Sequence, residues 1–323
     1  MARSLWVLGL DGGGSHTVCL VVDGEGRQAA RSVSGPCNHQ SVGVPAAQAA
    51  LTAAILAARQ EAGDPTLAAA CLGMAGFDRE EDLYLIAGMA APLLPGVQLE
   101  IVHDADIALA AGGGGRRPGV VVVAGTGSIA VGYDAAGRRA RAGGWGHLLG
   151  DEGSGYDIAR KGLSAATRAY DGRAEGTILI ERLPMAAETP TLEKLANRIY
   201  LENWTVGQVA ALAPVVLAAA EAGDPAALEI LEAAAGQLAQ AARVVIAGLR
   251  LQEQAFPVVL SGGLFTSHTR LFELVREAIL DFAPQACVSL PRHEPAYGAA
   301  LLALEAARRV GASSDLEQHP DPL

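Results

Sequence analysis

The most constraining feature of the sequence is a glycine-rich segment between two apolar runs near its start. The segment DGGGSHT, residues 11–17, separates apolar residues 5–10 from apolar residues 18–23. This pattern predicts a hairpin whose tip exposes backbone N–H groups, with an ordinary tight turn of glycines at positive φ as the alternative. Backbone N–H groups can bind phosphate oxygens, and the carboxylate of Asp11 can hold a hydrated Mg²⁺ beside them. The hairpin therefore indicates nucleotide chemistry.

Two other glycine loops that bind phosphates do not match these residues. A Walker loop has the form GxxxxGK[ST], but the only lysines are Lys161 and Lys194, and neither follows a glycine. A dinucleotide fingerprint has the form GxGxxG and opens a helix. Here Thr17 stands in place of the third glycine, and the next segment has the pattern of a strand.

Composition limits the class of protein. A length of 323 residues predicts about two domains, and 50% hydrophobic with 18% charged residues predicts a large core. The net charge of −11 argues against nucleic acid and against anionic membrane surfaces as partners. No apolar run approaches the ~20 residues that span a bilayer, and no signal-peptide hydrophobic region precedes the first strand. We therefore expect a cytoplasmic protein.

The four cysteines are far apart and lack CxxC spacing, so they do not indicate a zinc site. In a reducing compartment we expect no disulfides and a buried free thiol at each position. The positions are Cys19, Cys37, Cys71 and Cys287.

The first third of the chain alternates between strand and helix patterns. After the hairpin, strands are expected at 27–34, 67–74 and 97–103, and helices at 46–62 and 79–90. This alternation predicts a mixed or parallel sheet covered by helices.

The second half repeats the opening pattern after a glycine run at 112–115, which we interpret as a hinge or domain boundary. An apolar strand at 120–124, a glycine turn at 125–128 and a second strand at 129–133 repeat the order strand, turn, strand. We therefore expect two halves of related design. The remaining expected elements are a helical region at 192–251 broken near 223–225, a strand at 257–260, a helix at 296–309, and a frayed polar tail.

Six segments together resemble the sugar-kinase/Hsp70/actin ATPase superfamily. Within it, the sequence is most similar to the BadF/BadG/BcrA/BcrD-type ATPase family, in the branch of N-acetylglucosamine and glucosamine kinases. The segment GGWGHLLGDEGS at 143–154 is the most specific, and the matches run from residue 11 to about residue 300. The matching segments are DGGGSHT, GPCNH, HDADIALA, AGTGSIA, GGWGHLLGDEGSGYDIA and VVLSGGLF.

The resemblance implies an α/β fold of two ribonuclease H-like (actin-like ATPase) domains. Each would be a mixed sheet flanked by helices, with an interdomain cleft. Residues 1–114 would form an N-terminal ATPase and sugar-binding domain, onto which the helix at about 296–309 packs back, and residues 115–323 a C-terminal ATPase domain. The implied ligands are ATP, Mg²⁺ and an amino sugar, and the implied assembly is a homodimer.

The resemblance also implies site residues. Asp11 would position Mg²⁺, and Asp104 would be the catalytic base. The residues implied to contact ATP phosphates are Gly13, Gly14, Ser15 and Thr17 in the first hairpin and Gly125, Thr126 and Gly127 in the second turn. Those implied to lie against adenosine are Gly262 and Gly263, and those implied to line the amino-sugar pocket are Asn38, Asp104, Gly144, Trp145 and Asp151.

Each of these residues also has a purely structural interpretation. Asp104 can cap a helix starting near Asp106, Asp151 can cap the next helix, Trp145 can be a core residue, and Asn38 can be a turn residue. Their joint occurrence in the order of the family favours the functional interpretation.

The resulting hypothesis is an ATP-dependent kinase for the 6-hydroxyl of N-acetylglucosamine or glucosamine. Another amino sugar, such as N-acetylmuramic acid, remains an alternative. A second hypothesis is an ATPase that activates a partner enzyme through an iron–sulfur cluster, but no cysteine follows the second glycine turn where the ligands are expected. A third, a sugar-responsive repressor of the ROK group, requires a DNA-binding extension before the first strand and the zinc motif CxCGxxGCxE. Neither is found in this sequence.

Overall fold

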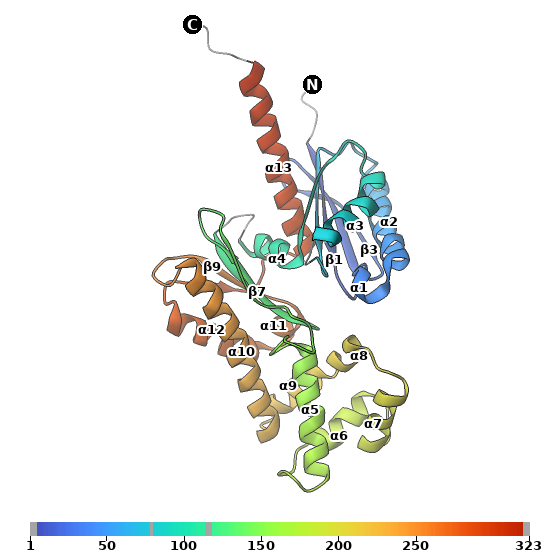
Figure 1. Ribbon diagram of the computed structural model, residues 1–323, viewed down its shortest axis with the longest axis vertical. Coiled ribbons are helices and arrows are strands. Elements are labelled where there is room, and N and C mark those ends of the chain that lie inside the picture. The colour runs from blue at the N-terminus through green and yellow to red at the C-terminus, as the bar shows by residue number, and fades with distance from the viewer. Residues whose placement is uncertain (1–4, 78–79, 114–117, 319–323) are drawn as a thin grey trace. The chain divides into compact units, whose positions relative to one another are not determined.

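The computed structural model describes residues 5–77, 80–113 and 118–318, and the side chains only up to residue 309 (Figure 1). The chain divides into two compact units. Unit 1 comprises Met1–Arg117 together with Pro291–Leu323, and unit 2 comprises Pro118–Leu290. The expected boundary at 114/115, half of the glycine run and the last residues of the polar tail lie outside the described residues.

Unit 1 contains a five-stranded mixed sheet with the order β3-β2-β1-β4-β5. The first three strands form antiparallel pairs, whereas β4 and β5 run parallel to β1. The strands are β1 (Trp6–Gly12), β2 (Thr17–Asp23), β3 (Gln28–Ser34), β4 (Ala69–Met74) and β5 (Gln98–His103). The helices of this unit are α1 (His39–Val42), α2 (Val44–Glu61), α3 (Glu80–Ala90), the 3₁₀ helix η1 (Ala91–Leu93), α4 (Asp104–Gly113) and α13 (Pro295–Gln318).

The alternation of side chains along β1 assigns the two faces of this sheet. Leu8 and Leu10 belong to a buried cluster with α2 and α3, whereas Val7 belongs to a second cluster with α4 and α13. Successive residues of a strand point to opposite faces, so one apolar strand can supply both cores. Both faces are therefore covered by helices.

Helix α13 approaches the sheet and α4 closely because glycines stand at the contact points (Figure 1). A Cβ atom at Gly9 would lie 2.3 Å from the carbonyl oxygen of Ala296 in α13. A Cβ atom at Gly298 would lie 2.0 Å from the carbonyl oxygen of Ile107 in α4. Both distances are far below van der Waals contact with rigid backbone, so only glycine permits this packing.

Unit 2 contains a second five-stranded sheet with the corresponding order β10-β9-β6-β7-β8. As in unit 1, the first three strands of the unit form antiparallel pairs and the later two run parallel to the first. The strands are β6 (Gly119–Ala124), β7 (Ser128–Tyr133), β8 (Arg139–Gly143), β9 (Pro257–Ser261) and β10 (Cys287–Ser289). The expectation of two halves of related design is confirmed.

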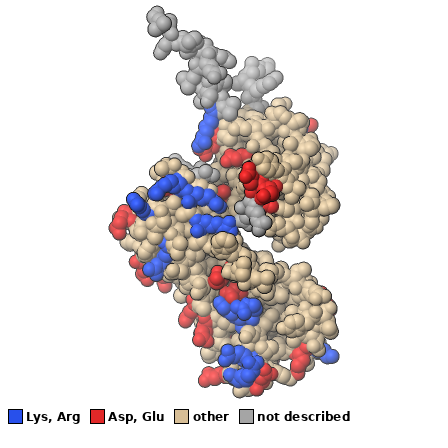
Figure 2. Space-filling view, in the orientation of Figure 1, with Lys and Arg blue, Asp and Glu red and all other residues tan. Residues whose placement is uncertain are grey.

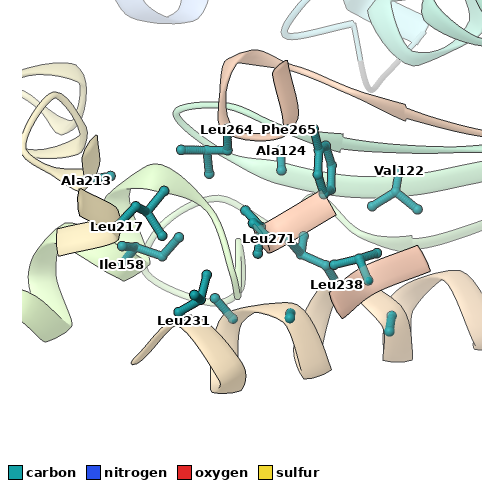
Figure 3. Packing of buried hydrophobic residues seen from close by; sticks show 14 of the residues in the cluster. Val122, Ala124, Ile158, Ala213, Leu217, Leu231, Leu238, Leu264, Phe265 and Leu271 are labelled. Carbon is teal, nitrogen blue, oxygen red and sulfur yellow. The ribbon is translucent and has the colours of Figure 1, made fainter. Parts of the chain in front are cut away.

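Helices of unit 2 enclose its main core. Leu217, Leu231 and Leu238 from the helices meet Val122 of β6 and Phe265 of α11 in one buried cluster (Figure 3). The helices are α5 (Gly155–Tyr170), α6 (Leu179–Ala186), α7 (Leu192–Leu201), α8 (Val206–Ala210), α9 (Ala213–Glu221), α10 (Pro225–Leu249), α11 (Gly263–Ser267) and α12 (Thr269–Phe282).

Among the described residues, one helix, α10, is long and apolar enough to cross a membrane by length and composition. It is not an uninterrupted apolar run, because Glu229, Glu232 and Arg243 lie within it. Its buried side chains, including Leu231, Leu238 and Ile246, belong to the core of unit 2. In this structure α10 is therefore a core helix, and its length reflects the size of that core.

Most of the expected elements are present, with shifted ends. The helical region at 192–251 breaks where expected, because Asp224 caps α10 and Pro225 is its first residue, but it also breaks twice earlier, at 202–205 and 211–212. Cys19, Cys37 and Cys71 are buried as expected, whereas Cys287 is exposed. The reason is that Cys287 lies on β10, a three-residue strand at the edge of its sheet.

Charged side chains are scattered over the surface. On the face drawn in Figure 2, Lys and Arg side chains form separate groups with Asp and Glu side chains nearby, and much of the face is uncharged.

The close packing of α13 makes a test of unit 1. Gly298→Ala should lower the free energy of unfolding by about 1–3 kcal/mol, because the added methyl group forces α13 away from α4. Gly88→Ala in α3 meets nothing within 4 Å, so it should raise stability by about 0.5–1 kcal/mol through helix propensity. Urea unfolding of both variants checks this, and equal effects would contradict the packing argument.

Candidate active site

In unit 1, three parallel strands end at the same edge of the sheet. Gly12 of β1 is in register with Met74 of β4, and Met74 is in register with His103 of β5. Asp104 follows β5 directly and begins α4. The carboxyl edge of a sheet of this kind is where α/β proteins place ligands. The expected residues Asp11 and Asp104 are thus brought to one edge.

The tip of the β1–β2 hairpin is closed by its own backbone. The N–H of Gly13 donates to the carbonyl of His16 at 3.1 Å. Gly14 and Ser15 are exposed, whereas Thr17 is fully buried and donates its hydroxyl to the carbonyl of Gly35 at 2.8 Å. The tip therefore presents Gly14 and Ser15 outward, and the hydroxyl of Thr17 holds the next loop.

That loop carries Asn38 to the same edge. The N–H of Cys37 donates to the carbonyl of Gly13 at 3.2 Å, which attaches the loop to the hairpin. A Cβ atom at Gly12 would lie 2.6 Å from the sulfur of Cys37, so a larger residue there would displace the thiol. Asn38 caps α1, with its Oδ1 accepting from the N–H of Gln40 at 3.0 Å. The structural interpretation of Asn38 therefore agrees with its role as a helix cap, and the residue lies beside the hairpin.

Asp11 lies in an unusually acidic environment. Burial, together with the negative charges of Asp104 and Glu294, raises the pKa of Asp11 from 3.8 to about 7. Removing a carboxylate from water and placing it near like charges both disfavour its ionised form. The edge of unit 1 therefore concentrates negative charge that a cation would stabilise.

The carboxylates at this edge fit a cation that keeps most of its waters better than a metal ion held entirely by protein side chains. Among the described residues, no group of three or more His, Cys, Asp and Glu side chains is arranged to hold a metal ion. Magnesium keeps several waters and is bound through one or two carboxylates plus phosphate oxygens. The partly buried carboxylate of Asp11 fits that mode.

The carboxylate of Asp104 is buried at one oxygen, although the side chain as a whole is partly exposed. Its Oδ1 is buried, lies 2.5 Å from Nδ1 of His103, and has no hydrogen-bond partner among the described residues. The N–H of Ala105 donates to the same Nδ1 at 3.1 Å. The side chain of Asp104 is 31% exposed, so it can reach a ligand. The interpretation as a cap of a helix near Asp106 is wrong in position, because α4 begins at Asp104 itself.

In unit 2, the second glycine turn is fastened to the segment that follows β8. The N–H of Gly125 donates to the carbonyl of Gly127 at 3.0 Å and closes the turn. The carbonyl of Gly125 accepts from the N–H of Gly155 at 2.8 Å, and the hydroxyl of Ser128 donates to the carbonyl of Glu152 at 2.8 Å. The turn and the segment therefore form one hydrogen-bonded assembly.

Asp151 lies against this turn. A Cβ atom at Gly127 would be 2.8 Å from Oδ2 of Asp151, so a larger residue there would displace the carboxylate from its present position. Burial raises the pKa of Asp151, and hydrogen bonds from the backbone N–H groups of Ser128 and Gly146 oppose that shift. The interpretation of Asp151 as a helix cap is wrong, because Ser154 caps α5.

Gly144 and Trp145 lie on the same segment. Gly144 has φ of +72°, and its N–H donates to the carbonyl of Ser128 at 3.0 Å. Trp145 is 71% exposed, so its interpretation as a core residue is wrong. The guanidinium of Arg141 lies 5.8 Å from the centre of its ring. An exposed indole of this kind offers a flat apolar face to a ligand.

Gly262 completes the carboxyl edge of the second sheet. It follows β9 with φ of +107°, and a Cβ atom there would lie 2.2 Å from the carbonyl oxygen of Ala124. Gly262 is therefore packed against the strand end that leads into the second turn. Gly263 begins α11, and a Cβ atom there would meet nothing within 4 Å, which leaves an open surface.

One acidic residue near this edge was missed by the sequence reasoning. Glu294 precedes α13, forms a two-pronged ion pair with Arg31 of β3 at 3.0 Å, and lies near enough to Asp11 to raise its pKa. Its only signal in the sequence is a charged residue before the final helix. Nothing local relates residue 294 to residue 11.

Comparison with known proteins identifies the family. The model of the BadF/BadG/BcrA/BcrD ATPase family matches residues 8–303. The chain belongs to this family. It is 34% identical over 300 residues to a protein of Clostridium acetobutylicum named N-acetylmuramic acid/N-acetylglucosamine kinase, covering 92% of this chain and 98% of that protein.

A second relative and a solved structure agree with this. The chain is 34% identical over 322 residues to N-acetyl-D-glucosamine kinase of Dictyostelium discoideum, covering 94% of this chain and 99% of that protein. The crystal structure of a putative N-acetylglucosamine kinase from Chromobacterium violaceum matches with a TM-score of 0.73 and 28% identity, covering 93% and 99% of the two chains. Each unit of this BadF-type protein is thus a ribonuclease H-like (actin-like ATPase) mixed sheet flanked by helices, as expected.

The environment of Asp11 predicts a pH dependence of stability in the metal-free protein. Because its pKa is raised to about 7, the folded state holds a proton that the unfolded chain releases near pH 4. This contribution to stability is present below about pH 4 and is lost as the pH rises through 7. Asp11→Asn should flatten that decline and be more stable than the original protein at pH 8 by about 1–3 kcal/mol.

Urea unfolding at pH 5 and pH 8 in the presence of a chelator measures this effect. Glu100→Gln on β5 is the control and should leave the decline unchanged. A decline of equal slope in the Asp11→Asn protein would show that Asp11 does not carry the extra proton.

Proposed function

We propose that this protein is an ATP-dependent amino-sugar kinase that transfers the γ-phosphate to the 6-hydroxyl of N-acetylglucosamine or glucosamine. The observation that carries the proposal is the 34% identity, over more than nine-tenths of the chain, to two kinases named for such sugars. Membership of an ATPase family supports ATP as the nucleotide. One of the relatives is also named for N-acetylmuramic acid, which keeps that sugar as an alternative acceptor.

The proposed catalytic base is Asp104. Phosphoryl transfer depends mainly on positioning and charge neutralisation, so the protein needs a group that orients the acceptor hydroxyl and takes its proton. Asp104 stands at the carboxyl edge of the first sheet with a partly exposed carboxylate, as that role requires. A carboxylate in this role contributes ~10²–10⁴-fold in rate.

The proposed phosphate contacts are made by the two glycine turns. Unit 1 supplies Gly13, Gly14 and Ser15, with Thr17 holding the loop behind them through its buried hydroxyl. Unit 2 supplies Gly125, Thr126 and Gly127, and adenosine would lie against Gly262 and Gly263, of which Gly263 has open space beside its backbone. Magnesium would bind Asp11 through water, and when bound it would neutralise charge on the transferred phosphoryl group.

The proposed sugar contacts are polar groups beside one exposed aromatic ring. Asn38 and Asp104 in unit 1, and Gly144 and Asp151 in unit 2, offer amide, carboxylate and backbone groups to sugar hydroxyls. The exposed indole of Trp145 offers a face to the apolar side of a pyranose ring.

We further propose a cytoplasmic homodimer. Unit 2 exposes Met185 of α6 and Tyr200 and Leu201 of α7, large apolar side chains of the kind that subunit interfaces bury. Analytical ultracentrifugation at micromolar concentration tests this assembly.

Replacing the proposed base gives the first test of the reaction. Asp104→Asn should lower kcat by about 10²–10⁴-fold, because the amide cannot take the proton of the acceptor hydroxyl. ATP affinity by calorimetry should stay near that of the original protein, and Glu100→Gln should retain full turnover. Unchanged sugar phosphorylation in the Asp104→Asn protein would remove this residue from the mechanism.

A panel of acceptors gives the second test. In an ADP-release assay we expect turnover with N-acetylglucosamine or glucosamine, and weak or no turnover with glucose. Turnover mainly with N-acetylmuramic acid would change the assigned sugar. ATP hydrolysis that no sugar stimulates would instead favour an ATPase that serves a partner enzyme.

A further inference from the structure

We propose that Asp157 is a positioning residue for the amino-sugar site, because it fixes the turn at 151–154 that carries Asp151. The inference rests on the proposed function, in which Asp151 contacts the sugar. Asp157 lies on α5 and is not itself placed against a ligand. It acts on the turn through the backbone.

The side chain of Asp157 joins the helix to the turn that precedes it. The residue is only 8% exposed, and its Oδ2 accepts from the N–H of Gly153 at 3.0 Å and from Nζ of Lys161 at 2.7 Å. Its own N–H donates to Oγ of Ser154 at 3.2 Å. Asp157 therefore accepts a backbone donor from outside the helix, while Lys161 and the more distant guanidinium of Arg160, 3.3 Å from Oδ1, compensate its charge.

This contact goes beyond ordinary helix capping. In a capping box, the side chain at the third helical position accepts from the N–H of the capping residue. Ser154 is the capping residue here, yet Asp157 accepts from Gly153, one residue further out. Through this hydrogen bond, α5 restrains the backbone of the turn at 151–154 that precedes it.

The turn needs such a restraint because its backbone is in a disfavoured conformation. Asp151 has φ of +58° and Gly153 has φ of +75°. A left-handed conformation at a residue other than glycine persists only where its surroundings hold it. The N–H of Ser154 donates to the carbonyl of Asp151 at 3.1 Å, so the position of Gly153 and Ser154 determines where Asp151 lies.

The other side of the turn is fixed by packing. A Cβ atom at Gly153 would lie 2.7 Å from the carbonyl oxygen of Ala234 and 2.7 Å from Cγ of Leu238, both in α10. Gly153 is therefore held between the core helix and the carboxylate of Asp157. Loss of that carboxylate leaves the N–H of Gly153 without its acceptor and frees the turn to move, and Asp151 moves with it.

Three substitutions separate the parts of this arrangement. Asp157→Ala removes the acceptor of the Gly153 N–H, Asp157→Asn keeps an oxygen acceptor but removes the charge, and Lys161→Met removes only the compensating ammonium group. The matched control is Asp134→Ala. Asp134 is 9% exposed in the same unit, accepts from the N–H groups of Ala136 and Arg138, and pairs with the Arg138 side chain, but lies in the β7–β8 turn.

The steady-state readout separates positioning from general loss of stability. Asp157→Ala should raise KM for the amino sugar about tenfold, with less than about a threefold change in KM for ATP. Asp157→Asn and Lys161→Met should raise KM for the sugar less than Asp157→Ala does. Asp134→Ala should lower the melting temperature and leave KM for the sugar unchanged.

A second readout does not depend on activity. Hydrogen exchange of the unliganded protein should be faster at residues 151–154 in Asp157→Ala, with the strands of unit 1 unchanged. If the original protein phosphorylates no sugar, the proposed function fails, while this exchange experiment still tests the restraint.

Any of three results would overturn the inference. The first is an unchanged sugar KM in the Asp157→Ala protein, and the second is an equal increase of the sugar KM in Asp134→Ala. The third is unchanged hydrogen exchange at residues 151–154 in Asp157→Ala. If Asp157→Ala does not fold, the same comparisons apply to Asp157→Asn, which retains an acceptor and should show the same changes at reduced size.

Discussion

The organisation of unit 1 depends on a contact that only glycine allows. Gly9 of β1 and Gly298 of α13 remove the two Cβ atoms that would otherwise hold the final helix away from the sheet and from α4. With α13 in this position, the segment before it places Glu294 near Asp11, and Arg31 holds Glu294 through an ion pair. The position of Glu294, which adds to burial and to the charge of Asp104 in raising the pKa of Asp11, thus depends on how closely a distant helix packs.

The two units share one strand order, but the carboxyl edges of their sheets carry different chemical groups. In unit 1 the edge carries ionisable side chains, Asp11 and Asp104, in a partly buried setting. In unit 2 the edge is mostly backbone, with Gly127 packed against the carboxylate of Asp151 and Gly262 against the main chain of Ala124. A kinase needs both kinds of surface, one to handle a proton and a metal, the other to follow the outline of a nucleotide.

Local patterns in the sequence were sufficient to predict the elements that follow simple periodicity. Clear signals exist for the two hairpins, for the strands that end at Met74 and His103, and for the helix break before Pro225. All of these elements are present. Short or polar elements such as β8 and β10 were not predicted, because their pairing with neighbours rather than their own pattern makes them strands.

The site could be predicted only in part, for the same reason. The residues carrying chemistry stood in recognisable segments, whereas their partners are set by tertiary packing. Glu294 and Asp157 have no local signal, since one depends on the return of α13 and the other on a backbone N–H outside its own helix. The structural interpretations of Trp145 and Asp151 were wrong because exposure and cap position are decided by neighbouring loops.

The division of unit 1 into two sequence segments has a consequence for biosynthesis. Unit 2, Pro118–Leu290, is translated between the first segment of unit 1 and the helix that covers its sheet. Domains generally fold as they leave the ribosome. The apolar face around Val7 therefore has only α4 to cover it until the whole of unit 2 has been made and α13 emerges. During that interval the apolar face around Val7 is most exposed to non-native contacts, which chaperones prevent.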